Sequence, residues 1–268
     1  MTADPTYRGF ALDAETALAL LQWQTELGAD EPCLDAPLNR YELSEQVDPA
    51  VASATAATRP PIAAAAAAVD PVAQATTMAT AATTLEALAE AQQAFDGIDL
   101  KRGARNFCFA DGRPQARVMI VGEAPGEEED RQGRPFVGRA GQLLDQMFAA
   151  IGLSRQSPDA QTALYITNVL PWRPPGNRQP TAEEIAMMLP FLHRHIQLAQ
   201  PEVLVLMGNT PCAALLHKQG ITRLRGQWHR ALDLPVLPMT HPAYLLRTPL
   251  AKRQAWQDLL ALQARLRD

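Results

Sequence analysis

Short apolar runs alternate along the chain with longer stretches in which apolar residues recur every three or four positions. The short runs are rich in β-branched residues, as in buried strands, and the longer stretches have the spacing of amphipathic helices. Alternating strands and helices indicate a parallel sheet covered on both faces. We predict an α/β fold, a three-layer sandwich with a central, mostly parallel sheet of about four strands flanked by helices. The predicted strands are 118–121, 165–170, 203–207 and 236–239, and the main predicted helices are 85–95, 142–151, 181–200, 212–216 and 252–267.

The chain before residue 85 has a different composition. Residues 1–34 contain one predicted short amphipathic helix, at 11–27, whereas residues 35–84 are rich in Ala, Thr and Pro. A segment with so few large apolar side chains cannot bury enough surface to offset the entropy of ordering. We therefore expect a small N-terminal helical segment at 1–34, a flexible linker at 35–84 and the main α/β domain at 85–268.

Charge is distributed unevenly along the 268 residues. Residues 1–99 hold 3 Lys/Arg and 15 Asp/Glu, a net charge of −12, whereas residues 100–268 hold 21 and 14, a net charge of +7. The basic part permits binding to a polyanion such as nucleic acid, which the acidic part would repel. The chain has no apolar run of membrane-spanning length, and its start lacks the features of a signal peptide. We expect a cytoplasmic protein that does not contact a membrane.

The three cysteines, Cys33, Cys108 and Cys212, are far apart in the sequence and form no CxxC pair. This spacing offers neither a disulfide framework nor a metal site. We interpret them as small buried thiols and expect no metal ligands among them.

Polar residues with different chemistry follow three of the predicted strands. Glu123 follows the first, Asn168 lies in the second and His241 follows the last. Because parallel strands end at one edge of a sheet, an acid, an amide and an imidazole can converge on one pocket. The amide can read a planar edge that presents an N–H and a carbonyl, and the imidazole can stabilise negative charge on a leaving group. With Phe136 as a stacking face, this set suits a flat heterocycle such as uracil.

Each of these residues also has a purely structural interpretation. Asn168 at a strand end can be a turn former, and His241 before a proline can hydrogen-bond within a turn. Phe136 can belong to the core, and Glu123 can cap the backbone that follows it. The acidic run at 127–130 argues against a simple phosphate cradle in the Gly-rich loop after the first strand.

Five segments resemble, in order and spacing, the family-four uracil-DNA glycosylases. The resemblance covers residues 85–265 and rests on the segments at 122–126, 135–138, 167–168, 173–178 and 241–247. It implies a DNA repair enzyme that hydrolyses the N-glycosidic bond of a flipped-out deoxyuridine. Residues 85–268 would then be the catalytic domain, uracil-containing DNA the partner, and the protein a monomer.

The resemblance also implies roles for individual residues. His241 would stabilise the departing uracil anion, Glu123 would position or polarise water, and Asn177 would shape that water site. Ala124 occupies a position where more distant uracil glycosylases carry a water-activating Asp, which favours a largely dissociative reaction. The implied substrate contacts are Gly122, Ala124, Glu129 (crowding the pyrimidine C5), Phe136 (stacking) and Asn168 (reading the uracil edge).

The same resemblance suggests where DNA is held. Leu245 or Leu246 would fill the stack vacated by the flipped base, and Arg247 would hold a phosphate. Arg178 would also contact DNA. For the two leucines, packing in the core is the structural alternative.

One departure from the family concerns its cofactor. Family-four enzymes typically bind a 4Fe–4S cluster through four cysteines, and thiolates are needed to hold it. The corresponding positions of this chain carry Phe95, Ile98, Trp172 and Met188. We therefore expect no cluster, no metal and no other cofactor, with apolar packing in place of the cluster.

Two other functions stay open. One is non-hydrolytic or covalent binding of uracil-DNA, as in a branch of the superfamily with a basic, His-containing insertion, although residues 138–160 contain no His. The other is a nucleotide-binding or scaffold α/β domain that has lost catalysis. The acidic N-terminal arm would be the part that binds a protein partner.

Overall fold

The computed structural model describes residues 6–7, 10–11 and 70–267. The chain divides into two units, Met1–Ala66 and Ala67–Asp268. In the first, two short strands are described, β1 (Thr6–Tyr7) and β2 (Phe10–Ala11), which pair in antiparallel fashion. The predicted helix at 11–27, beyond its first residue, and positions 35–69 of the predicted linker lie outside the described residues.

The second unit is built on a mixed six-stranded sheet with the order β3-β5-β4-β6-β8-β7. The four central strands are mutually parallel, and the two edge strands are antiparallel to their neighbours. The parallel strands match the four predicted ones, but the sheet has six strands rather than about four. The edge strands are too short to show an alternating pattern. The strands are β3 (Ala110–Gly112), β4 (Val118–Gly122), β5 (Leu164–Asn168), β6 (Val203–Met207), β7 (His229–Ala231) and β8 (Leu234–Met239).

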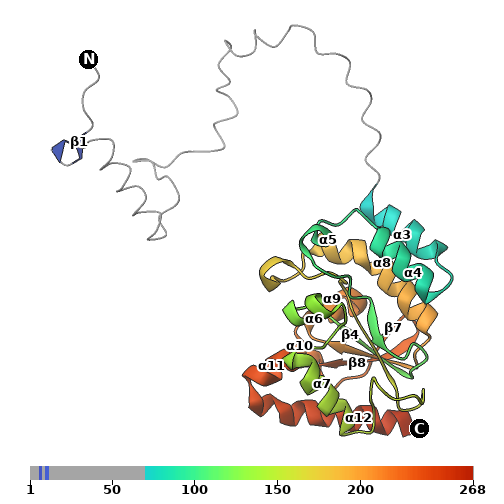
Figure 1. Cartoon of the computed structure of the whole chain (residues 1–268). Coiled ribbons are helices and arrows are strands. Elements are labelled where there is room, and N and C mark those ends of the chain that lie inside the picture. The colour runs from blue at the N-terminus through green and yellow to red at the C-terminus, as the bar shows by residue number, and fades with distance from the viewer. Residues whose placement is uncertain (1–5, 8–9, 12–69, 268) are drawn as a thin grey trace. The chain divides into compact units, whose positions relative to one another are not determined.

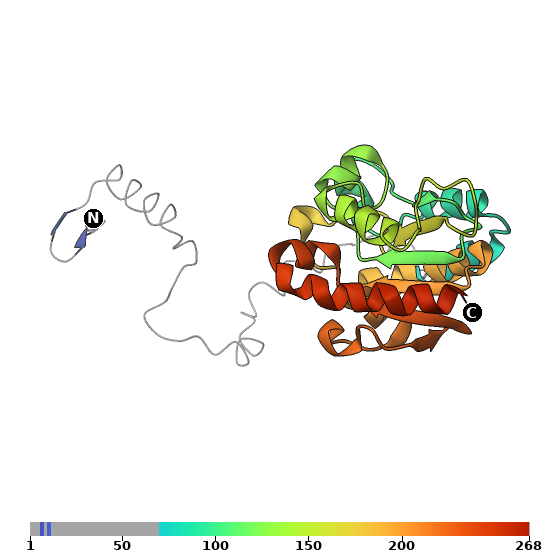
Figure 2. The same cartoon turned by 90° about the horizontal axis from the view of Figure 1, so that it is seen from below.

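Helices cover both faces of the sheet, which gives the predicted three layers (Figures 1 and 2). Successive residues of β4 point to opposite faces, so Met119 and Val121 enter one core and Val118 and Ile120 the other. The first core is covered by α3 (Pro71–Ala81), α4 (Leu85–Ala94), α8 (Ala182–Ala199) and α9 (Asn209–Leu216). The second is covered by α7 (Arg139–Ala149) and α12 (Lys252–Arg267), the red helix in Figure 2.

The remaining helices are short and lie in the connections between these elements. None of the helices in the described ranges is long and apolar enough to cross a membrane. The short helices are α5 (Leu100–Gly103), α6 (Glu127–Gln132), η2 (Pro175–Asn177), α10 (Ile221–Leu224), α11 (Pro242–Arg247) and η3 (Pro249–Ala251).

Helix α3 corrects the predicted extent of the linker. Asp70 caps this helix by accepting a hydrogen bond from the Val72 backbone N–H at 3.0 Å. Ala75 and Ala79, one helical turn apart, are buried as α3 packs against α8. The prediction of a flexible linker up to residue 84 is therefore wrong for residues 70–84. Composition was misleading here because small side chains let two helices approach closely, so that alanine can form an interface.

Helix α8 starts where its sequence predicts. The Thr181 hydroxyl accepts from the Glu184 backbone N–H at 3.2 Å, and the Glu184 carboxylate accepts from the Thr181 N–H at 2.8 Å. This reciprocal pair is the predicted capping box. It fixes the chain that leads out of the 173–178 loop.

Candidate active site

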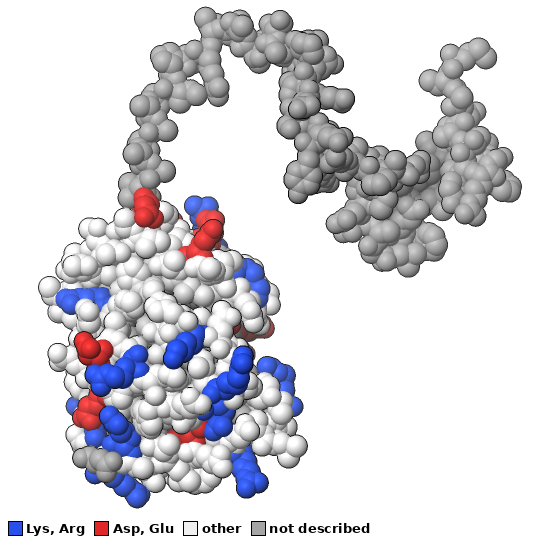
Figure 3. Space-filling view, turned by 180° about the vertical axis from the view of Figure 1, so that it is seen from behind, with Lys and Arg blue, Asp and Glu red and all other residues white. Residues whose placement is uncertain are grey.

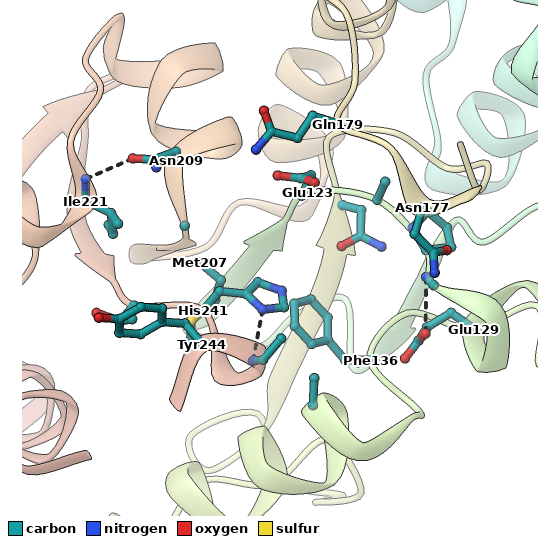
Figure 4. Close-up of a pocket in the computed structure, with 18 of the residues that line it drawn as sticks. Glu123, Glu129, Phe136, Asn177, Gln179, Met207, Asn209, Ile221, His241 and Tyr244 are labelled. Atoms are coloured by element: carbon teal, nitrogen blue, oxygen red, sulfur yellow. Dashed lines mark hydrogen bonds between the residues drawn. The ribbon is translucent and has the colours of Figure 1, made fainter. Parts of the chain in front are cut away.

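The carboxyl ends of the parallel strands surround a hollow of about 630 Å³. Two of its walls come from the segments after β4 and β8, and another comes from the loop after β5. Figure 4 shows the His241 imidazole beside the Phe136 ring, with the Glu123 carboxylate in the same hollow. The predicted acid, amide and imidazole therefore line the same hollow. The predicted site residues that line the hollow are Glu123, Ala124, Glu129, Phe136, Asn168, Asn177, Arg178, His241 and Arg247.

Asn168 ends β5 beside Gly122, its register partner at the end of β4. The Asn168 side chain is buried, and its carbonyl oxygen Oδ1 has no hydrogen-bond partner. A Cβ at Gly122 would lie 2.3 Å from this oxygen and 2.5 Å from a ring carbon of Phe136. Only glycine therefore leaves room for the amide and the ring together. Gly122 acts beneath the hollow rather than as part of its lining.

His241 caps the N-terminus of α11. Its Nδ1 accepts a hydrogen bond from the backbone N–H of Ala243 at 3.1 Å, which leaves the proton of the neutral ring on Nε2. Burial, and to a lesser extent the Arg247 guanidinium, lower the pKa of His241 to about 4, although Glu129 acts in the opposite direction. Near neutral pH, His241 is therefore a neutral hydrogen-bond donor that faces the hollow.

Phe136 presents its ring from a left-handed backbone conformation, with a φ of 53°. The ring lies next to the His241 imidazole, with centroids 5.4 Å apart and an angle of 30° between the planes. Phe136 is only 5% exposed, which fits its structural interpretation as a core residue, and it also lines the hollow, where the predicted stacking face would lie.

Glu123 receives a hydrogen bond from the hydroxyl of Thr210, in the first turn of α9. This contact fixes one carboxylate oxygen at the mouth of the hollow. Asn177, across the hollow, has a φ of 56°, and its side-chain oxygen accepts from Arg173 Nε at 2.8 Å. Both predicted water-site residues are thus held in place by contacts within the site.

Glu129 has a different environment from the predicted one. Its Oε1 accepts from the backbone N–H groups of Val137 and Gly138 at 2.9 and 2.8 Å, and its Oε2 accepts from that of Gly126 at 3.2 Å. The carboxylate therefore ties two loops together. These contacts favour a structural role in the pocket wall over the predicted crowding of the pyrimidine C5.

Comparison with known proteins identifies the family. The sequence profile of the Uracil DNA glycosylase superfamily matches residues 109–260, more than half of the chain. A type-4 uracil-DNA glycosylase of Sulfurisphaera tokodaii is 40% identical over 163 residues, which cover 57% of this chain and 71% of that protein. The chain belongs to the family-four uracil-DNA glycosylases.

Further relatives agree with this assignment. The type-4 uracil-DNA glycosylase of Thermotoga maritima is 38% identical to this glycosylase over 168 residues, which span 61% of the chain and 83% of the relative. That of Pyrobaculum aerophilum is 33% identical over 184 residues, spanning 65% and 91%. The similarity thus extends over most of each relative.

The four residues predicted to contact DNA differ in how far their side chains are free to reach it. Leu245 is 1% exposed, which contradicts its predicted insertion into the duplex, whereas Leu246, on the outer side of α11, is 37% exposed. The Arg178 guanidinium binds both carboxylate oxygens of Glu184, so it supports the loop of the glycosylase at the edge of the hollow. Arg247 lines the hollow.

The charge of the glycosylase surface suits a polyanion. Figure 3 shows the face opposite to that of Figure 1, where Lys and Arg side chains are more widely spread than Asp and Glu. The described residues 70–267 hold 21 Lys/Arg and 18 Asp/Glu, a net charge of +3, which has the same sign as the +7 of residues 100–268 but is smaller.

The four positions of the family's cluster ligands do not fit an iron–sulfur cluster. They lie together in the core beneath α4 and α8, where none is more than 3% exposed. The Phe95 ring packs edge-on against Phe191 at 5.6 Å, and Gln92 donates to the Met188 sulfur at 3.6 Å. Apolar side chains cannot replace the four thiolates. The packed residues are Phe95, Ile98, Trp172 and Met188.

Two cysteines of the glycosylase fall within the described residues. Cys108 and Cys212 are both buried and free, as predicted. Burial raises the pKa of each thiol to about 12, with Asp130 and Glu129 adding to the effect at Cys108. Such thiols are not poised to be nucleophiles or ligands. Cys33 lies outside the described residues.

Sequence reasoning missed two residues that hold the site. Thr210 follows β6, and applying the strand-end rule to that strand as well would have found it. Arg155, whose contacts are described below, lies in a loop without any motif. No local signal in the sequence indicates its role.

Proposed function

We propose that this glycosylase excises uracil from DNA by hydrolysing the N-glycosidic bond of a flipped-out deoxyuridine, and that Asn168 recognises the base. The observation that carries the proposal is the buried, unpartnered Oδ1 of Asn168 at the floor of the hollow. A buried acceptor without a partner is costly, so its retention favours a ligand that donates to it. Uracil presents an N–H next to a carbonyl, the complement of a side-chain amide.

His241 then stabilises the leaving group. Its Nδ1 accepts from Ala243, so Nε2–H is the group available for the negative charge that develops on the uracil oxygen. A neutral donor suits this task because it needs no proton from solvent at neutral pH. With Ala124 in place of a water-activating carboxylate, departure of a stabilised anion accounts for most of the chemistry.

Glu123 and Asn177 position the water molecule that completes the hydrolysis. Thr210 holds the Glu123 carboxylate at the mouth of the hollow, and Arg173 holds the Asn177 side chain. A fixed carboxylate can orient a water molecule or stabilise positive charge developing on the sugar. Phe136 supplies the face on which the extruded base stacks.

On the DNA side, Leu246 takes the place vacated by the flipped nucleotide and Arg247 holds a backbone phosphate. The exposure of Leu246 and the burial of its neighbour Leu245 support this choice between the two leucines. Unstacking a base is offset by filling the gap it leaves.

The enzyme works without an iron–sulfur cluster. In support, the four ligand positions form part of an apolar core that joins α4 to α8 and to the loop after β5. Iron analysis and a visible spectrum of anaerobically purified protein test this directly. Stoichiometric iron with a broad visible absorption band would overturn the proposal.

Three further expectations concern the protein in the cell. We propose that the glycosylase acts as a monomer in the cytoplasm, and that its acidic N-terminal arm binds a protein partner. Light scattering coupled to size exclusion tests the first expectation. Comparing the full chain with a chain that lacks residues 1–66 in affinity capture tests the last.

The excision assay uses single- and double-stranded oligonucleotides with one uracil, followed by alkaline cleavage of abasic sites. We expect strand cleavage only where uracil was present, with release of free uracil. A DNA adduct that survives denaturation, without release of uracil, would instead indicate covalent binding.

A further inference from the structure

Arg155 is an almost buried cation next to the active site. Its side chain is only 8% exposed. Two of its contacts are to carboxylates, with Nε donating to Asp145 at 2.8 Å and Nη1 to Asp111 at 3.0 Å. These two ion pairs tie the loop after α7 to α7 itself and to the edge strand β3.

The other contacts of Arg155 are to the backbone of the loop that presents Phe136. Nη1 donates to the carbonyl of Pro135 at 3.0 Å, and Nη2 donates to that of Phe136 at 2.9 Å. The guanidinium therefore makes four hydrogen bonds at once, in a planar arrangement that a lysine ammonium cannot reproduce.

Phe136 needs such support because of its backbone conformation. A φ of 53° is unfavourable for a residue with a bulky side chain and persists only where the surroundings over-determine it. Glu129 holds the amides that follow the ring, at Val137 and Gly138. Arg155 holds the carbonyls that precede and follow the Phe136 Cα. The backbone that carries the ring is thus held by an anion at its amides and by a cation at its carbonyls.

We propose that Arg155 is the positioning residue for base stacking, holding the backbone of Phe136 so that its ring is in place before the uracil arrives. This inference rests on the proposed stacking role of Phe136. Stacking stabilises the flipped base both before and during bond cleavage. Loss of Arg155 should therefore raise KM and lower kcat to a smaller extent.

A double-mutant cycle tests the inference. Arg155→Met and Phe136→Ala should each lower kcat/KM on a single-stranded uracil oligonucleotide about tenfold to one-hundredfold, the effect of losing one stacking contact. Combined, they should lower it little further than Phe136→Ala alone, because Arg155 acts through Phe136. Arg155→Lys, which keeps the charge but not the four contacts, should give an intermediate loss.

Arg225→Met is the matched control. Arg225 is also mostly buried and ion-paired, to Asp258, but it makes no contact with the Phe136 loop. KM is measured at a temperature where circular dichroism shows that Arg155→Met and Arg225→Met are both fully folded. There, Arg225→Met should have the same KM as the wild-type enzyme.

Three results decide the outcome. If the two arginine variants raise KM equally, Arg155 has only a general structural role and the inference is wrong. The inference is also wrong if Arg155→Met lowers kcat/KM by the same factor in the wild-type enzyme and in the Phe136→Ala variant. If Phe136→Ala alone leaves kcat/KM unchanged, the stacking proposal itself fails, which is a distinguishable result.

Discussion

Replacing Asn168 by Ala should abolish most of the activity while hardly changing stability. The side chain of Asn168 makes no hydrogen bond within the described protein, and its Oδ1 is buried without a partner. Removing it therefore breaks no internal hydrogen bond and relieves an unpaired acceptor. The small cavity that remains opens into the hollow. We expect the free energy of unfolding to change by no more than about 1 kcal/mol, or about 2–4 °C in Tm for a domain of this size.

The effect on catalysis should be far larger. Two hydrogen bonds join the amide to the uracil edge in the proposed complex, and leaving both uracil groups unpaired costs about 1–3 kcal/mol each. A total of about 2–6 kcal/mol corresponds to a decrease in rate of about 30-fold to 10⁴-fold. The assay is single-turnover cleavage of a uracil oligonucleotide, with the thermal unfolding midpoint measured on the same preparation.

Gln92 supplies the matched control, since it is also an amide that is 6% exposed but lies in the core beneath α8. Gln92→Ala loses a hydrogen bond to the Met188 sulfur and should lower Tm without changing the single-turnover rate. An Asn168→Ala enzyme within threefold of the wild-type rate would refute the reasoning, as would one that unfolds.

Three other measurements follow from the structure. Because the pKa of His241 is lowered to about 4, the imidazole stays neutral and the excision rate should not change as the pH passes through 6.5. The free energy of unfolding, in contrast, should fall as the pH drops from about 6.5 to about 4, since the unfolded chain binds the proton more readily than the folded one. A step in the rate near pH 6.5 that His241→Gln removes would contradict this. Tyr165→Phe leaves buried His195 without its 2.8 Å partner and should cost about 1–3 kcal/mol, seen as a Tm lower by about 2–10 °C at unchanged activity. Leu246→Ala should slow excision from duplex DNA at unchanged Tm, whereas Leu245→Ala should destabilise by about 2–5 kcal/mol; the opposite pattern would assign the duplex contact to Leu245.

Much of the sheet could be predicted from the sequence. Strand β6 and helix α12 have the predicted bounds, because runs of β-branched residues and a helical period are local properties of the chain. The four predicted strands do not include the edge strands β3 and β7, since three residues carry no period. Helix α3 was assigned to a linker because its alanines gain stability only from the presence of α8.

The meeting of Glu123, Asn168 and His241 was also predictable, for a topological reason. Once the strands are parallel, their carboxyl ends must share one edge, whatever the details of packing. Glu129 shows the limit of this reasoning. Its position in the wall was foreseen, but its hydrogen bonds to loops on either side were not.

The sequence by itself thus determined the fold class, the family and the chemical groups of the site. Tertiary structure alone decided which leucine faces outward, where the Glu129 carboxylate binds and that Arg155 supports Phe136. The physical reason is the range of the interactions. Strand and helix patterns are set by neighbours along the chain, whereas Arg155 binds groups that lie 10 to 44 residues away in sequence and that meet only when the sheet and its helices have packed.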